Sequence, residues 1–243
     1  MKNASAMPLP FDPADLLGYA LRDYFINGTD VPVKVWINGR RDEDLMPSLF
    51  FRNYRHMRAW DRQALRMAKG SVLDAGAGSG GHSLILQGRG MDVTAVERSP
   101  ASCEVMRLRG VQRVIQENLL DLRGIPFDTI LMLMNGLGMA GTEKETLKLF
   151  RHLRKMLTKG GQIIGDSTDI LYSRMDSLAG FLQGNTYYGE VEFRLEYRGV
   201  KGTPFRWLYL DPALLAELSD KAGLHCEIVQ RSKDFHYLAR LTA

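Results

Sequence analysis

Between residues 71 and 167 the chain alternates short apolar runs with amphipathic segments. Continuous apolar runs indicate strands buried on both faces, and the amphipathic segments between them indicate helices that cover those faces. The pattern therefore predicts a parallel sheet wrapped by helices. Its strands are expected at residues 71–75, 91–97, 111–116, 128–135 and 162–166, with helices ending near Gln87, before Gly110 and near Thr158.

The chain after residue 210 changes character. Asp211 and Pro212 can begin a helix and Gly223 can end it, around a stripe of leucines. Beyond this helix, residues 225–230 and 235–241 are separated by a polar turn and predict an antiparallel hairpin. The prediction is an α/β fold with a doubly wound, seven-stranded sheet, mostly parallel, that ends in a C-terminal antiparallel hairpin.

Two stretches lie outside this predicted core. The first contains a short helix near residues 14–25 and a short strand near residues 33–37. The second contains residues 190–198 and 205–210, which predict a hairpin about two glycines. Both stretches are candidates to cover the open end of the sheet.

On this pattern we expect an N-terminal cap, residues 1–58, and a domain of residues 59–243 with a lid-like insertion at about 171–210. The insertion is rich in aromatic side chains, which favours closure over a small molecule. These aromatic residues are Tyr172, Phe181, Tyr187, Tyr188, Phe193, Tyr197, Phe205, Trp207 and Tyr209.

Charge changes this picture little. The chain has 32 Lys and Arg against 28 Asp and Glu, mixed along its length, and a formal charge of +4. The densest basic stretch, residues 52–69, has arginines at near-helical spacing with aromatic residues among them. It could contact a phosphate backbone, but a solvated helix face is the favoured interpretation, so nucleic acid is not an expected partner.

Cysteine usage and hydropathy suggest a cytoplasmic protein. Cys103 and Cys226 stand far apart without a CxxC or Cys/His spacing, so neither a disulfide nor a metal site is expected. The N-terminus lacks the apolar run of a secretory signal. No stretch approaches the roughly 20 apolar residues of a membrane span, so no membrane partner is expected.

The strongest chemical signal is a glycine loop directly after the first predicted strand, Asp74-Ala75-Gly76-Ala77-Gly78-Ser79-Gly80-Gly81. Glycines there let the backbone turn sharply and approach a ligand closely. The same glycines fit the GxGxxG loop of dinucleotide enzymes. Asp74 argues against that ligand, because the dinucleotide loop directs N–H groups at a pyrophosphate, which a carboxylate would repel. A ligand with ammonium and sulfonium groups is compatible with Asp74.

Two further signals indicate a nucleoside. Glu97 closes the second predicted strand, where a carboxylate can accept both hydrogens of a ribose diol. After the third predicted strand, Asn118 offers an amide to the edge of an adenine and Leu119 can cover its face. A dinucleotide contains this diol, and so does a nucleoside with ammonium and sulfonium groups. Glu97 therefore does not distinguish these two kinds of ligand.

Together with FDTILMLMNG and LRKMLTKGGQIIGDS, these motifs resemble the class I S-adenosylmethionine-dependent methyltransferase family over roughly residues 70–243. The resemblance implies a Rossmann-like sheet that ends in the antiparallel pair inferred above. It also implies S-adenosylmethionine as cofactor, with its methionine part at the glycine loop, its ribose at Glu97 and its adenine at Asn118, where Asp is commoner in the family. The cofactor-binding candidates are Asp74, Gly76, Ala77, Gly78, Gly80, His82, Glu97, Arg98, Asn118, Leu119, Asn135 and Arg52.

The DEDLMP, FFRNYRHM and YYGEVEFRLEYRG segments resemble a bacterial branch of the same family, a likeness that attaches no acceptor to the chain. The N-terminal segment resembles a cap that lays aromatic and Arg side chains over the cofactor. Arg52 and Tyr54 are thus candidates to contact the methionine carboxylate or the acceptor, although packing of the cap against the core explains them equally well. His82 is similarly open between a cofactor contact and helix capping.

Acceptor candidates come from the carboxyl ends of the strands and from the insertion. Asn135 falls where ligands collect in open α/β sheets, although an Asn before Gly also serves a plain turn. His56 or Asp166 could act as a base toward an amine or hydroxyl. No catalytic residue is assigned, because an activated methyl group mainly needs an acceptor held in line and shielded from water. The acceptor candidates are Tyr54, His56, Asp166, Tyr187, Tyr188 and Trp207.

We therefore predict methyl transfer from S-adenosylmethionine to an unidentified small-molecule acceptor. The alternative enzyme class is a nicotinamide-dependent oxidoreductase that uses the same glycine loop. A non-catalytic nucleoside-binding protein is the alternative without chemistry, since function resides in the site and not in the fold. The sequence predicts no oligomeric state.

Overall fold

A seven-stranded sheet forms the centre of the computed structural model, which describes residues 11–171 and 187–243. The strand order is β11-β12-β7-β6-β3-β4-β5. The neighbouring strands β7, β6, β3, β4 and β5 pair in parallel. Strands β12 and β11 extend the sheet beyond β7 in antiparallel pairing, which confirms the predicted fold class. The strands are β3 (Val72–Ala75), β4 (Val93–Glu97), β5 (Val114–Gln116), β6 (Phe127–Met132), β7 (Leu157–Thr168), β11 (His225–Arg231) and β12 (His236–Thr242).

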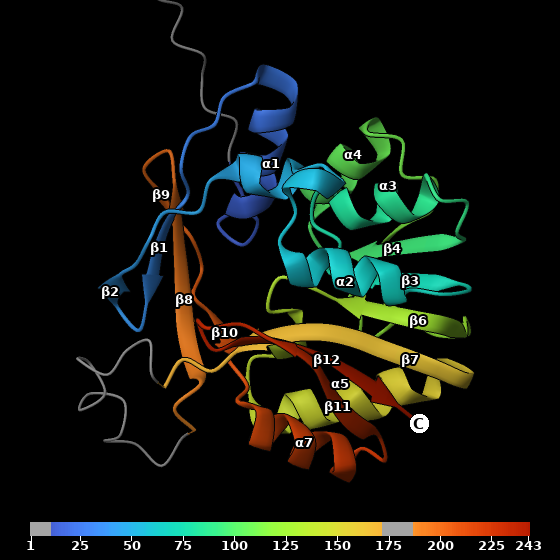
Figure 1. Cartoon of the computed structure of the whole chain (residues 1–243). Coiled ribbons are helices and arrows are strands. Elements are labelled where there is room, and N and C mark those ends of the chain that lie inside the picture. The colour runs from blue at the N-terminus through green and yellow to red at the C-terminus, as the bar shows by residue number, and fades with distance from the viewer. Residues whose placement is uncertain (1–10, 172–186) are drawn as a thin grey trace, which may run out of the picture.

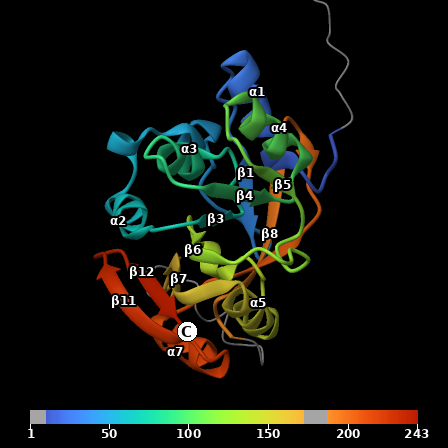
Figure 2. The same ribbon diagram turned by 90° about the vertical axis from the view of Figure 1, so that its right-hand side faces the viewer.

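Helices cover both faces of this sheet. Buried residues of α2 and α3 form one core with Val72, Val93 and Ile164, and α4 packs on the same face against Ala95. Buried residues of α5 and α7 form the larger core on the opposite face. Figure 2 shows α3 and α5 on opposite sides of the strands. The helices are α2 (Ala59–Met67), α3 (Gly81–Gln87), α4 (Pro100–Leu108), α5 (Glu143–Lys155) and α7 (Pro212–Lys221).

The α5 helix shows how local sequence and burial agree. The Thr142 hydroxyl caps the helix by accepting a hydrogen bond from the Glu145 N–H at 3.2 Å. Leu149, Phe150 and Leu153 are at most 2% exposed, and burial of each contributes about 1.5–3 kcal/mol before its entropy cost. The cap and the buried face therefore both fit a helix that packs on the sheet, although it ends at Lys155 rather than near Thr158.

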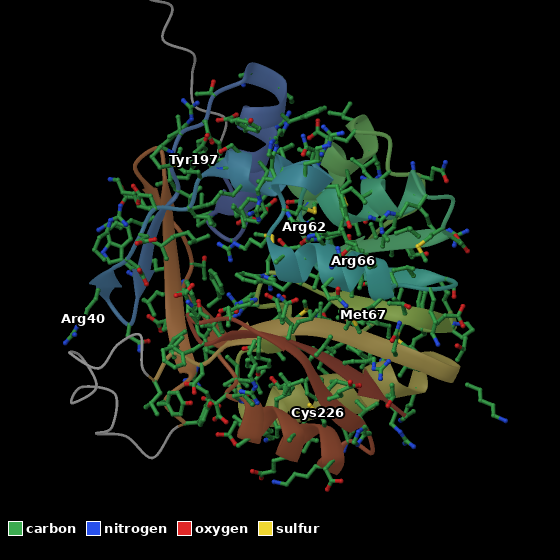
Figure 3. All side chains as sticks on the ribbon, in the orientation of Figure 1. Arg40, Arg62, Arg66, Met67, Tyr197 and Cys226 are labelled. Atoms are coloured by element: carbon green, nitrogen blue, oxygen red, sulfur yellow. The ribbon has the colours of Figure 1, made fainter. Side chains whose placement is uncertain are left out.

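A second sheet joins the two predicted appendages. Its order is β10-β8-β1-β2, with β9 also paired to β8, so strand β1 of the N-terminal segment pairs with β8 of the insertion. Figure 1 shows this sheet standing across one end of the seven-stranded sheet, with Arg40 at its outer tip (Figure 3). Its strands are β1 (Lys34–Ile37), β2 (Arg40–Arg41), β8 (Glu190–Tyr197), β9 (Val200–Lys201) and β10 (Phe205–Leu208).

The N-terminal segment also contains helix α1 (Leu16–Asn27) and two 3-10 helices, η1 (Pro47–Phe51) and η2 (Tyr54–His56). Leu16 and Ala20 of α1 pack against Tyr197 of β8. The division at residue 58 into cap and domain stays a prediction. Residues 172–186 of the predicted lid lie outside the described residues.

Several predicted strand boundaries were wrong; β5, for example, begins at Val114 rather than at residue 111, and two other differences have a cause in the backbone. β7 begins at Leu157 rather than at residue 162, because the strand passes through Gly160, whose φ of +78° a glycine adopts easily. β6 ends at Met132 rather than at Asn135, because Met134 and Asn135 adopt φ values of +62° and +61°. A short 3-10 helix, η3 (Gly136–Gly138), follows them.

Cys103 and Cys226 are both free. Cys103 is a buried residue of α4, and burial raises the pKa of its thiol to about 11. Figure 3 places Cys226 beside α7, where it packs against the larger core.

Within residues 11–171 and 187–243, no cluster of His, Cys, Asp and Glu could hold a metal ion. None of the helices in the described part of the chain combines the length and apolar character needed to cross a bilayer.

Candidate functional site

The glycine loop turns tightly between β3 and α3. Gly76, Gly78 and Gly80 have φ values of +71°, +55° and +77°, in the left-handed region that side chains disfavour. The N–H groups of Gly76 and Ala77 donate to the Val96 carbonyl at 2.9 and 3.2 Å, which ties the loop to β4. Glycine is therefore required here by the backbone geometry itself.

Asp74 lies in β3 directly before this loop and is 2% exposed. Its Oδ2 accepts a hydrogen bond from the Ser83 hydroxyl of α3 at 2.6 Å. One carboxylate oxygen is thereby held by the helix that follows the loop. The buried negative charge stands beside the backbone that a ligand would approach.

Glu97 ends β4 next to the same loop. Its Oε2 accepts from the Gly78 N–H at 3.1 Å, and its Oε1 accepts from the Ser99 N–H at 3.0 Å. Each carboxylate oxygen keeps further acceptor capacity after one such bond. Arg98, the next residue, is exposed.

The predicted adenine contacts lie at the end of β5. Asn118 is exposed, and its Oδ1 accepts a hydrogen bond from the Leu120 N–H at 3.0 Å. Its amide nitrogen is therefore the group that can donate to an adenine. Leu119 is 8% exposed and packs into the larger core. Covering an adenine face with Leu119 would therefore use only a small exposed part of that side chain.

The N-terminal segment brings an arginine to a buried carboxylate. Arg52 Nη2 lies 3.9 Å from Oδ2 of Asp61, which is 1% exposed in the first turn of α2. Burial raises the pKa of Asp61, partly opposed by His82, and burial also lowers the pKa of Arg52. Arg52 and His82 therefore both lie close enough to Asp61 for their charges to act on it, and Asp61 is a residue that the sequence did not reveal.

Two other candidates from this segment lie elsewhere. The Tyr54 hydroxyl accepts from Arg66 Nη1 at 3.4 Å, and the Arg89 guanidinium lies 4.8 Å from the Tyr54 ring centre. Figure 3 shows Arg62 and Arg66 along α2. His56 is exposed on η2. Tyr54 therefore packs against Arg66 of α2 and Arg89, and His56 stays at the surface of η2.

Asn135 links both sheets. Its N–H donates to Asp166 Oδ2 at 3.1 Å, and its Oδ1 accepts from the Thr168 hydroxyl at 2.9 Å. Its carbonyl accepts from Trp207 Nε1 of β10 at 3.2 Å. The left-handed backbone of a non-glycine residue is strained, and such strain gathers at functional sites.

Asp166 has a partner that the sequence analysis missed. His236, the first residue of β12, pairs with Thr168 in the sheet, and its Nε2 lies 2.9 Å from Asp166 Oδ2. The Trp60 ring of α2 packs on the imidazole with ring centres 4.1 Å apart. The available signal was its place at the start of a strand antiparallel to β7, which puts it at the carboxyl edge of the parallel strands.

Tyr187 and Tyr188 lie just before β8, and both hydroxyls donate hydrogen bonds to carboxylates. The Tyr187 hydroxyl donates to Asp211 Oδ2 at 2.6 Å, and the Tyr188 hydroxyl donates to Asp169 Oδ1 at 2.8 Å. Burial raises the pKa of both phenols, that of Tyr187 the more strongly. Both therefore stay protonated at neutral pH and act as donors.

Comparisons with known proteins agree on one enzyme class. A family model described as a methyltransferase domain matches residues 72–161. The chain is similar to a solved SAM-dependent methyltransferase from Bacteroides fragilis in complex with S-adenosyl-L-homocysteine. The TM-score is 0.87 and the identity 38%, over 97% of this chain and 98% of that one.

Two more distant relatives carry less weight. The CcbJ methyltransferase from Streptomyces caelestis has a TM-score of 0.61 and 18% identity, over 79% of this chain and 98% of that one, and at this identity it shows the fold alone. The cypemycin N-terminal methyltransferase of a Streptomyces species is 30% identical over 103 residues. That match spans 41% of this chain and 42% of the relative, less than half of each protein.

Proposed function

The chain belongs to the class I S-adenosylmethionine-dependent methyltransferases, and we propose that it methylates a small molecule at the carboxyl edge of its seven-stranded sheet. Membership rests on the likeness to the Bacteroides fragilis enzyme over nearly the whole of both chains. The predicted enzyme class and cofactor are confirmed. The comparisons support neither the nicotinamide-dependent oxidoreductase nor the non-catalytic alternative.

The residues of the glycine loop suit this cofactor. Around Gly78, the nearest atom to a Cβ built there is Phe50 Cδ1 at 3.8 Å, so the missing side chain leaves room beside the backbone. Glu97 stands against the same N–H and can accept the ribose hydroxyls, and the Asp74 carboxylate is compatible with a cationic ligand. Bound S-adenosylmethionine supplies an electrophilic methyl group. We assign the methionine carboxylate to Arg52, whose guanidinium lies 3.9 Å from the buried Asp61 carboxylate.

The hydrogen bond from Trp207 to the Asn135 carbonyl carries the proposal for the acceptor. It brings one face of the second sheet to the carboxyl end of β6, where ligands of open α/β sheets bind. That face is aromatic, since Phe193, Phe205 and Trp207 pack against one another. An aromatic wall facing polar groups of the strand ends is suited to a small molecule with one reactive polar atom.

The small-molecule acceptor can be tested with methyl-labelled S-adenosylmethionine and a cell extract. The extract is separated by size into metabolites and polymer, and each fraction is incubated with the protein. We expect label in the metabolite fraction, with heat-denatured protein as the control. Label confined to polymer would overturn the small-molecule acceptor and leave the enzyme class intact.

A further inference from the structure

We propose that Asp166 and His236 together take up the proton released by the acceptor, and that the acceptor is an amine. This inference rests on the proposed function and names the chemical class of its substrate. It also adds a second residue, His236, to the reaction.

Thr168 fixes which nitrogen of His236 carries its proton. The Thr168 hydroxyl donates to Asn135 Oδ1 at 2.9 Å, so its oxygen is left to accept from His236 Nδ1, also at 2.9 Å. With Nδ1 protonated, Nε2 is the nitrogen that gains or loses a proton. This nitrogen faces Asp166 Oδ2 at 2.9 Å. A lone pair opposite a carboxylate oxygen favours uptake of one proton between them.

The pair also has unused polar atoms. Asp166 is 0% exposed and His236 is 5% exposed. Across the described segments, neither Asp166 Oδ1 nor His236 Nε2 has a geometrically sound hydrogen bond, although the ion-pair contact between the two residues is short. Buried polar groups are nearly always hydrogen-bonded, so two such atoms side by side indicate a place for a ligand's polar hydrogens.

The charges around the pair favour a cation. Asp61 of α2 lies close enough to Asp166 for their charges to interact, and the charges of Arg52, directly after η1, and His82 of α3 also act on Asp61. Tyr237, next to His236 in β12, senses the charge of Asp166 as well. The Trp60 ring packs against the imidazole and has the Arg58 guanidinium 5.4 Å from its centre. An ammonium group would supply the hydrogens that Asp166 Oδ1 lacks.

Charge favours an amine over an alcohol. An amine reaches the site from neutral water mostly as an ammonium ion and must lose one proton before its nitrogen can attack. A carboxylate–imidazole pair can accept that proton, and its carboxylate also attracts the positive charge of the ammonium, which a neutral hydroxyl lacks. Asp166 therefore binds the ammonium and starts its deprotonation.

Methyl transfer starts from the bound ammonium ion. One N–H bond breaks and its proton passes to the Asp166–His236 pair. The nitrogen lone pair forms the new N–C bond to the methyl group, while the electrons of the C–S bond stay on sulfur as a thioether. The product leaves as the methylammonium ion, and the proton held by the pair is released to water.

Chemical blocking of the acceptors tests the amine class. The metabolite fraction is treated with the N-hydroxysuccinimide ester of acetic acid, which acetylates amines, and labelling is compared before and after treatment. We expect most of the label to disappear. If untreated metabolites are labelled and acetylated ones remain equally labelled, the amine is excluded while the proposed function stands. If no metabolite is labelled at all, the proposed function fails and this inference with it.

Variants test the pair itself. D166N keeps the acceptor oxygen for the Asn135 N–H, and H236Q keeps a polar group for Thr168. General base catalysis typically contributes about 100-fold or more, so we expect a loss of that order near pH 7. The loss should shrink as pH rises, because more of the amine is already neutral in solution. Binding of S-adenosylhomocysteine, measured by calorimetry, should not change.

Matched controls are available on the protein surface. H225Q on β11 and D220N on α7 make the same chemical changes at exposed positions and should keep wild-type rates. A loss in D166N and H236Q that is the same at every pH, or accompanied by weaker S-adenosylhomocysteine binding, would overturn the proton-transfer role. Unchanged rates in both variants would overturn it as well.

Discussion

Glu97 Oε2 accepts a hydrogen bond from the Gly78 backbone N–H at 3.1 Å. The contact joins the end of β4 to the loop after β3, so the residue proposed to hold ribose also positions the backbone proposed to hold the methionine part of the cofactor. Replacing Glu97 should therefore affect the loop and the ligand together.

We expect E97A to weaken S-adenosylhomocysteine binding by about 10- to 100-fold, since hydrogen bonds to charged groups contribute about 1.5–3 kcal/mol. E97Q keeps one acceptor oxygen and should lose less. Calorimetric titration of both variants measures the difference. Equal affinity of E97A and the wild type would exclude Glu97 from the cofactor site.

Gly78 allows a comparison at constant backbone strain. Gly78 and Gly90 have φ values of +55° and +80°, and a Cβ at Gly90 would contact nothing within 4 Å. G78A and G90A should each lose roughly 1–2 kcal/mol of unfolding free energy, because both place an L-residue in the left-handed region. Only G78A should also lose S-adenosylhomocysteine binding. Equal binding by both variants would argue that Gly78 serves the turn alone.

The glycine loop and Glu97 could be predicted from the sequence because each follows a strand that its own apolar run reveals. Both can be recognised from neighbouring residues in the sequence, without knowledge of a contact to a distant residue. The seven-stranded sheet was predictable for the same reason. Strand ends were less predictable: Asn135 adopts a positive φ and hydrogen-bonds to Asp166 of β7 and Trp207 of β10, partners that lie far away in the sequence.

His236 and Asp61 could not be predicted in this way. His236 meets Asp166 only because β12 returns antiparallel to β7 with His236 opposite Thr168. Asp61 acts on Asp166 from a helix that precedes the first strand of the sheet. The pairing of β1 with β8 has the same origin, since alternation along a strand identifies its faces and not its partner.

Asp61 should leave a signature in the pH dependence of stability. Burial raises the pKa of this carboxyl above its usual 3.8, so the unfolded chain loses the proton first as pH rises. The free energy of unfolding should then fall as pH rises through that window. D61N removes this titration, and its stability relative to the wild type should increase from about pH 4 upward. Urea unfolding of both proteins at several pH values measures this difference in unfolding free energy. If the two proteins change in parallel with pH, the prediction is contradicted.

Asp128 should show the opposite sign. Hydrogen bonds, first from the Thr158 hydroxyl and then from Ser71, lower the pKa of the Asp128 carboxyl below 3.8. Its contribution to stability is therefore present above the unfolded value and is lost as pH falls through the folded one. D128N should be less stable than the wild type at neutral pH, and the gap should close in acid. A gap that stays constant in the same urea series would rule out this linkage.

Trp207 provides the test of how the second sheet serves the acceptor. W207F keeps an aromatic side chain against Phe193 and Phe205 but removes the hydrogen bond from Nε1 to the Asn135 carbonyl. One neutral hydrogen bond contributes about 1 kcal/mol, roughly a fivefold change in an equilibrium constant. At limiting metabolite concentration, labelling should fall by about that factor, while S-adenosylhomocysteine binding should be unchanged.

W36F is the matched control for this change. Trp36 lies in β1 of the same sheet, with its ring under the Arg41 guanidinium at 5.0 Å, and has no described contact with the strand ends of the seven-stranded sheet. If the second sheet acts through its aromatic face, W36F should label metabolites at the wild-type rate. An equal fall in W36F and W207F would mean that the sheet supports the fold alone, because only Trp207 is placed to hold Asn135 beside the acceptor.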